Sequence, residues 1–130
     1  LLEIYQTVQE LHPGYDGRVL FIPQRGCFAR GIYVTAYAKC DAPLEEVQKV
    51  YADYYQDAAF THFVVKSPDM KQVVNTNKAV VYVEKYEDQL LMICCIDNLL
   101  KGAVGQAVQN MNLKFGLDEK AGLNLKAIAF

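Results

Sequence analysis

The most restrictive feature of this sequence is a pair of apolar runs separated by only two residues. The first run covers residues 79–86 and the second covers residues 89–96, with Glu87 and Asp88 between them. Two β-prone runs joined by so short a connection predict an antiparallel hairpin. The second run is apolar from Leu90 to Ile96 without alternation, which is typical of a strand covered on both faces. The chain is therefore expected to build layers around this hairpin.

The rest of the chain adds strands and helices in a mixed order. β-Branched and aromatic residues predict strands at residues 18–23, 29–39 and 62–66, with a brief extended piece at 73–74. Helical spacing of apolar residues predicts helices at residues 3–11, from about 43 to 58, and within 97–116. This order favours an α+β domain, a mixed and largely antiparallel sheet with its helices packed on one face.

Composition limits the classes of partner. The 130 residues are enough for one domain with a sizeable core, and 52% hydrophobic with 22% charged residues indicates a globular chain. A net charge of −2 gives no electrostatic reason to bind nucleic acid or an anionic membrane surface. Apolar runs stay well below the length of a membrane span. Neither nucleic acid nor a membrane is expected as a partner.

The four cysteines, at positions 27, 40, 94 and 95, form no C-x-x-C pair, and only two histidines accompany them. A metal site is therefore not expected. Adjacent Cys94 and Cys95 lie in an apolar run and are interpreted as buried small hydrophobic residues. Reduced thiols suit a cytoplasmic protein. The chain also opens without Met and is in helical period from Ile4, so we expect residues 1–130 to be a single domain cut from a longer protein.

The segment 97–116 has an unusual polar face. Its apolar residues predict one buried stripe formed by Leu100, Ala103, Val104, Ala107, Val108 and Met111. The opposite face carries Gly102, Gly105, Gln106 and Gln109, and each glycine costs about 1 kcal/mol of helix stability relative to Ala. Either a ligand approaches these glycines, with Gln106 in reach of it, or another element of the domain packs tightly on them. Gly116 is the expected C-cap.

Two loops carry further candidate groups. In the loop at residues 23–31, Arg30 is a candidate anion contact. Cys27 lies between two arginines and is a candidate nucleophile, because a nearby guanidinium stabilises a thiolate. The alternative is a surface loop with an incidental cysteine. The amide side chains of Asn75 and Asn77 flank Thr76 and either contact a ligand or form Asx turns.

Residues 97–112, with their Asp-Asn-Leu, Lys-Gly-Ala-Val-Gly-Gln-Ala and Val-Gln-Asn runs, closely resemble the C-terminal signature of the N-acetyl-gamma-glutamyl-phosphate reductase family. Only Val104 departs from that signature, where Ala is usual. Further resemblance lies at residues 21–23, 30–32, 74–77, 117–119 and 122–123. Nearly all of the chain is covered.

This resemblance implies a domain like the C-terminal domain of glyceraldehyde-3-phosphate dehydrogenase. The parent would be a cytoplasmic NADP-dependent reductase of N-acyl-glutamyl 5-phosphate in arginine biosynthesis, active as a dimer or tetramer. Its nucleophilic cysteine and most NADP contacts would lie in an N-terminal domain, and its catalytic histidine in a His-Arg-His motif before Glu3. No catalytic residue is thus expected within residues 1–130. The resemblance implies cofactor contacts at Gly102, Gly105 and Gln106, and Arg30 is the expected substrate contact.

Two alternatives stay open at this point. One is a non-catalytic binding or assembly module. The other is the sister reductase of lysine biosynthesis, which acts on a carrier-linked aminoadipyl phosphate. The substrate's acyl group, acetyl or succinyl, is not specified by the residues.

Overall fold

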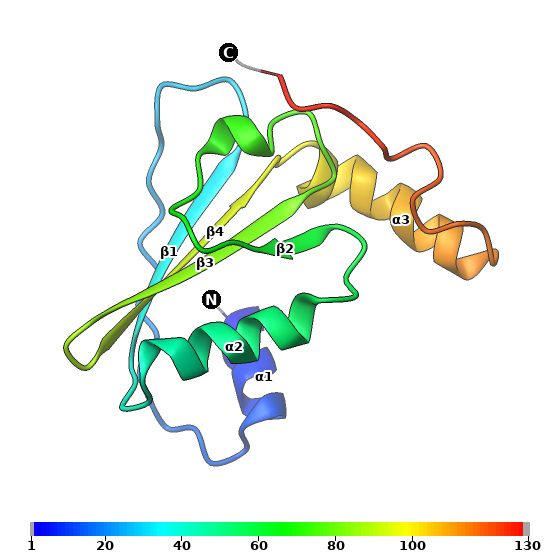
Figure 1. Ribbon diagram of the computed structural model, residues 1–130. Helices are drawn as coiled ribbons and strands as arrows, with labels where there is room; N and C mark the ends of the chain where they lie inside the picture. The colour runs from blue at the N-terminus through cyan, green and yellow to red at the C-terminus, as the bar shows by residue number, and fades with distance from the viewer. Residues whose placement is uncertain (1, 129–130) are drawn as a thin grey trace.

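The computed structural model describes residues 2–128, which form a four-stranded sheet in the order β1-β4-β3-β2 (Figure 1). The elements are α1 (Leu2–Leu11), β1 (Ile32–Lys39), α2 (Leu44–Tyr55), β2 (Thr61–Phe63), the 3-10 turn η1 (Met70–Gln72), β3 (Ala79–Tyr86), β4 (Gln89–Ile96), the π-helical turn η2 (Leu100–Val104) and α3 (Gly105–Lys114). β2 is parallel to β3 and the other pairs are antiparallel. The predicted α+β fold with a mixed, largely antiparallel sheet is confirmed.

The predicted hairpin is present with the expected bounds. β3 and β4 pair from Ala79 with Ile96 to Tyr86 with Gln89, and Glu87 in the connection takes a positive φ of 53°. A positive φ is what a two-residue hairpin turn requires. β4 is an inner strand with neighbours on both sides, so its backbone is fully engaged in the sheet.

Each face of the hairpin carries its own core. On one face, Val83 and Leu90 pack with Val47 of α2. On the other face, Val80, Ile93 and Cys95 pack around Val73, which is fully buried. Successive strand residues point to opposite faces, so these two clusters cannot share a side. The prediction that β4 is covered on both faces is confirmed, while the predicted extended piece at 73–74 is instead part of a turn.

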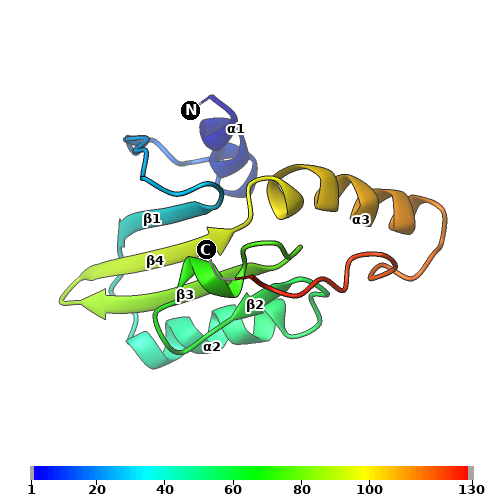
Figure 2. The ribbon, with the colours of Figure 1, turned by 90° about the horizontal axis from the view of Figure 1, so that it is seen from above.

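The predicted helix arrangement needs one refinement. α1 and α2 both lie below the sheet in Figure 1, but α1 buries none of its residues. α3 lies beyond the end of β4 and points away from the sheet, as Figures 1 and 2 both show. Only α2 thus packs closely on a face. Within residues 2–128, none of the helices has the length and apolar character to cross a membrane.

The predicted strand at residues 18–23 is wrong. This segment runs beside β1 in both views but forms no strand ladder, and Leu20, Phe21 and Ile22 are 70%, 61% and 76% exposed. β-Propensity largely reflects packing on a half-buried sheet surface, and no such surface covers this segment. β1 itself is an edge strand whose eight residues are all exposed.

Candidate functional site

Three separate parts of the sequence meet at one end of the sheet. Ile96 at the end of β4 pairs with Ile32 at the start of β1 and with Ala79 at the start of β3. The residues just before β1, just before β3 and just after β4 must therefore be neighbours. They are Arg30 and Gly31, Asn75 to Asn77, and Asp97 with Asn98, so the three candidate segments from the sequence form one cluster.

Asp97 is the centre of this cluster and is completely buried. Its Oδ1 accepts hydrogen bonds from Arg30 Nη2 at 2.9 Å and from the backbone amides of Leu99 and Leu100 at 2.8 and 2.9 Å. Its Oδ2 accepts from the backbone amide of Asn75 at 2.6 Å. Burial acts to raise the pKa of this carboxyl, but the hydrogen bonds from Arg30 and the amides together lower it. Asp97 therefore joins three chain segments as a carboxylate.

Arg30 is held along one edge by that carboxylate. Besides the hydrogen bond from Nη2, its Nε lies 2.7 Å from Asp97 Oδ2, an ion contact in which the N–H is not aligned as a hydrogen bond. The side chain remains 24% exposed. A guanidinium carries five N–H donors in a rigid plane, so its other edge is available to an anion. The Gly31 amide donates to Asn98 Oδ1 at 2.6 Å, which ties the loop to the same cluster.

The segment after Asp97 begins with a wider turn than an α-helix. Backbone amides of Gly102, Val104 and Gly105 donate five residues back, to Asp97, Leu99 and Leu100. Such π-turns are uncommon and frequently occur at functional sites. The turn inserts the equivalent of one residue, so residues before and after it no longer share the face that an uninterrupted helix would give them.

The predicted buried stripe is consequently wrong. Val104 and Met111 are 56% and 46% exposed, whereas the residues that α3 buries are Gly105, Gln109 and Asn112. The spacing of these three is that of one helical face, and it is the polar one. α3 therefore packs on its own domain through carboxamides and a glycine, and presents apolar side chains outward.

The two glycines of the helix have different surroundings. A Cβ on Gly105 would collide with Asn77 Oδ1 and would lie 2.9 Å from the Leu100 carbonyl oxygen. Packing within the domain therefore accounts for this glycine. Gly102 is exposed, and a Cβ there would make only ordinary contacts of 3.6 Å with Asp97 O and Ile96 Cδ1.

Lys101 belongs to the site although its role was not evident from the sequence. Its Nζ donates to Gln106 Oε1 at 2.8 Å and to Gln109 Oε1 at 2.9 Å, and lies 5.9 Å from the centre of the Phe60 ring. Gln109 also accepts from Asn77 Nδ2 at 3.1 Å. Burial lowers the pKa of Lys101, and Glu119 acts in the opposite direction. Gln106 lies five residues ahead of Lys101, and α-helical periodicity does not place residues five apart on one face.

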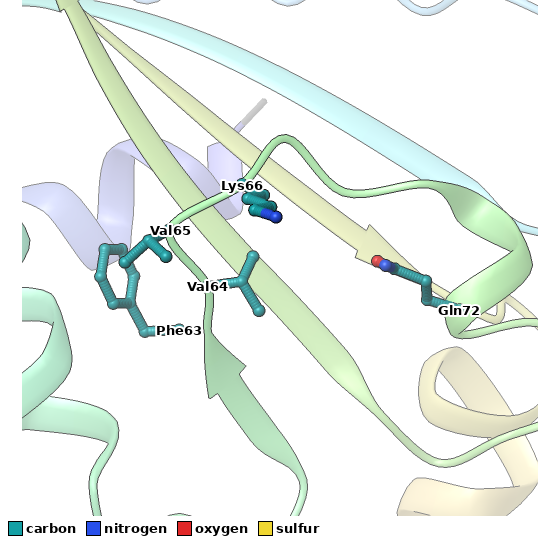
Figure 3. A pocket seen from close by; sticks show the side chains of 5 residues that line it. All are labelled: Phe63, Val64, Val65, Lys66 and Gln72. Atoms are coloured by element: carbon teal, nitrogen blue, oxygen red, sulfur yellow. The ribbon is translucent and has the colours of Figure 1, made fainter.

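Other candidate groups lie apart from this cluster. Cys27 is exposed in the loop before β1, and no hydrogen bond joins it to either histidine in the described part of the chain. A shallow hollow beside β2 is lined by Phe63, Val64, Val65, Lys66 and Gln72 (Figure 3). A second hollow on α2 is lined by tyrosines and Val50. The candidate site is therefore the polar cluster at the sheet end rather than either hollow.

Comparison with known proteins gives a consistent picture. The family model described as semialdehyde dehydrogenase, dimerisation domain, matches residues 1–98. The chain is 53% identical over all its 130 residues to N-acetyl-gamma-glutamyl-phosphate reductase of Parabacteroides distasonis, covering 40% of that protein. Over 98% of the chain it is 54% identical to the protein of the same name from Phocaeicola vulgatus, again covering 40%. It is 42% identical to the Karelsulcia muelleri protein of that name, over 97% of the chain and 39% of that protein.

Proposed function

Because this chain belongs to the semialdehyde dehydrogenase dimerisation domain family, we propose that it is the substrate-binding and dimerisation domain of a larger reductase. The reaction is the NADP-dependent conversion of N-acyl-glutamyl 5-phosphate to N-acyl-glutamate 5-semialdehyde in arginine biosynthesis. The chain spans about 40% of the length of the curated relatives it matches, and those relatives are named N-acetyl-gamma-glutamyl-phosphate reductase. Free cysteines suit a cytoplasmic protein.

The observation that carries this proposal is the polar cluster at the sheet end. It brings the guanidinium of Arg30 and the ammonium of Lys101 to the same end of the sheet. An N-acyl-glutamyl phosphate has two anionic groups, a carboxylate and a phosphate, and two cations suit such a ligand. Asp97 orients Arg30 so that its free edge receives the planar carboxylate bidentately. In this role Arg30 is the substrate contact.

Cofactor contact is assigned to the exposed side of the same segment. Gly102 leaves the backbone of η2 uncovered, so a flat ring can approach closely, and the half-buried carboxamide of Gln106 lies one turn further on. Gly105 is buried on the domain side of the same segment, where the absence of a side chain lets Asn77 pack against the helix. Gly102 and Gln106 would lie against a bound nicotinamide, which would supply the hydride chemistry of the reaction. The residues here orient the substrate and exclude water, and the nucleophilic thiol is assigned to a preceding domain.

Two exposed surfaces suit the proposed assembly. The outward apolar side chains of α3, such as Val104 and Met111, are assigned to packing against the cofactor domain of the parent. The part of the chain that matches the dimerisation family is residues 1–98, which includes the exposed β1 with Tyr33 and Tyr37. We assign pairing with a second copy to this sheet.

The test is an assay of the complete parent protein. With N-acetylglutamate semialdehyde, NADP⁺ and phosphate, the parent is expected to form NADPH only when all three are present. The 130-residue chain alone is expected to form none. A parent that acts only on the aminoadipate analogue would instead be the lysine-pathway enzyme, and a parent with no phosphate-dependent activity would overturn the proposal. Arg30→Lys is expected to raise KM for the semialdehyde about tenfold, because a lysine loses the bidentate contact.

A further inference from the structure

The two cations of the site differ in how far their charge is compensated. Arg30 is paired with a buried carboxylate. Lys101 contacts two carboxamides and the face of Phe60, and within residues 2–128 no carboxylate lies within ion-pair distance of its Nζ. Glu119 is the nearby acid, and its Oε1 accepts from Gln109 Nε2 at 2.6 Å instead. The half-buried ammonium of Lys101 therefore has no direct carboxylate partner within the described residues.

The surrounding residues hold this ammonium in one position. Gln109, which is 9% exposed, accepts from both Lys101 and the fully buried Asn77 and donates to Glu119. Buried amide groups are costly when unpaired, so these hydrogen bonds fix the orientation of Gln109. Asn77 is held through its Nδ2 alone, since its buried Oδ1 has no hydrogen-bond partner within the described residues. The π-turn brings Gln106 and Gln109 under the same ammonium, because one inserted residue moves the fifth and eighth residues onto its side.

A lysine ammonium has three N–H donors, and two of those on Lys101 are used by carboxamides. We propose that Lys101 binds a phosphoryl group at this end of the sheet through its remaining donor. The inference rests on the proposed function. It assigns the carboxylate of the substrate to Arg30 and the phosphoryl group to Lys101. The rigid fork of Arg30 fits a planar carboxylate, while the compact ammonium of Lys101 suits a phosphoryl oxygen.

Burial supports the same assignment. The pKa of Lys101 is lowered because burial penalises its charged form. A phosphate dianion beside the ammonium would stabilise the charged form of Lys101 and so offset the cost of its burial. This stabilisation favours binding of the anion. The phosphoryl group can come from the acyl phosphate, represented by inorganic phosphate in the reverse reaction, or from the dinucleotide.

The test uses the complete parent protein in the phosphate-dependent direction. Lys101→Met is expected to raise KM for inorganic phosphate at least tenfold, the effect of losing one charge-assisted hydrogen bond. KM for the semialdehyde should stay within twofold of the wild type. Lys114→Met, at the exposed last turn of α3, is the matched control and should leave every constant unchanged. If KM for NADP⁺ rises instead, the phosphoryl group at Lys101 is that of the cofactor.

A second measurement is independent of catalysis. Millimolar inorganic phosphate is expected to raise the Tm of the wild-type protein, at matched ionic strength, and not that of Lys101→Met. Lys101→Arg keeps the charge and should restore most of the shift. Equal shifts in wild type and Lys101→Met, or unchanged KM for both phosphate and NADP⁺, would overturn the proposal. A parent without reductase activity would refute the proposed function, while the Tm comparison would still test Lys101.

Discussion

A pair of Gly→Ala substitutions in one helical segment should have opposite effects on stability. Gly105 and Gly102 both have helical backbones and neither needs a positive φ. Alanine gains about 1 kcal/mol over glycine in a helix from backbone entropy and propensity alone. At Gly102 the added methyl makes only ordinary contacts, so Gly102→Ala is expected to raise the free energy of unfolding by up to about 1 kcal/mol.

At Gly105 the same methyl has no space. It would collide with Asn77 Oδ1 and press on the Leu100 carbonyl oxygen, neither of which is the end of a long flexible side chain. Overpacking costs about 1–3 kcal/mol, and moving Asn77 also loses its hydrogen bond to Gln109, worth about 1 kcal/mol. After the propensity gain, Gly105→Ala is expected to destabilise the protein by about 1–3 kcal/mol.

Urea unfolding followed by circular dichroism measures both variants against the wild type. A double-mutant cycle then tests the cause, because Asn77→Ser removes the colliding carboxamide. In that background Gly105→Ala should cost less than in the wild type, by about 1 kcal/mol or more. The reasoning would be refuted by a Gly105→Ala protein as stable as Gly102→Ala, or by additive effects of the two changes.

Three further predictions concern stability. Asp97→Asn should destabilise the protein by about 2–4 kcal/mol in urea titrations, because Arg30 then lacks its counter-charge; a loss below about 0.5 kcal/mol would contradict this role. The pKa of Asp97 is lowered in the folded state, so its stabilisation is present above the usual value of 3.8 and is lost as pH falls below it. Unfolding midpoints from pH 7 to 2 should therefore fall more steeply for the wild type than for Asp97→Asn, and parallel curves would exclude this linkage. Met111→Lys should change the free energy of unfolding by less than about 0.5 kcal/mol, because the side chain is exposed. Val73→Ala in the buried core should lower it by about 2–3 kcal/mol. Thermal melts that rank the two variants the other way would disprove the packing described here.

The hairpin and the helices could be predicted from local sequence because their signals are local. The bounds of β3 and β4 follow from two apolar runs and a two-residue turn, and α1 and α2 begin within a few residues of their expected starts. Gly116 likewise takes the positive φ, 67°, expected of a C-cap glycine. Short-range spacing and turn chemistry decide such features before any tertiary contact forms.

The site was only partly predictable. Arg30 and the Asn75–Asn77 loop could each be selected for their chemistry, whereas Asp97 was included only as the start of the 97–116 segment. The meeting of these three segments depends on strand register, which brings Ile32, Ala79 and Ile96 side by side. Asp97 also caps the turn that follows it, because it accepts from the backbone amides of Leu99 and Leu100. Its ion pair with Arg30 joins residues 67 positions apart, so local sequence patterns cannot indicate it.

By itself, the sequence determined the hairpin, the element order and the family, because these depend on composition, spacing and motif. Tertiary structure decided which face of the 97–116 segment is buried. A π-turn at Leu100–Val104 shifts the helical phase, so Gly105, Gln109 and Asn112 turn inward and the apolar stripe turns outward. The same shift places Lys101 over Gln106 and Gln109. Periodicity assumes a uniform helix, and only contacts with Asn77 and Asp97 reveal where that assumption fails.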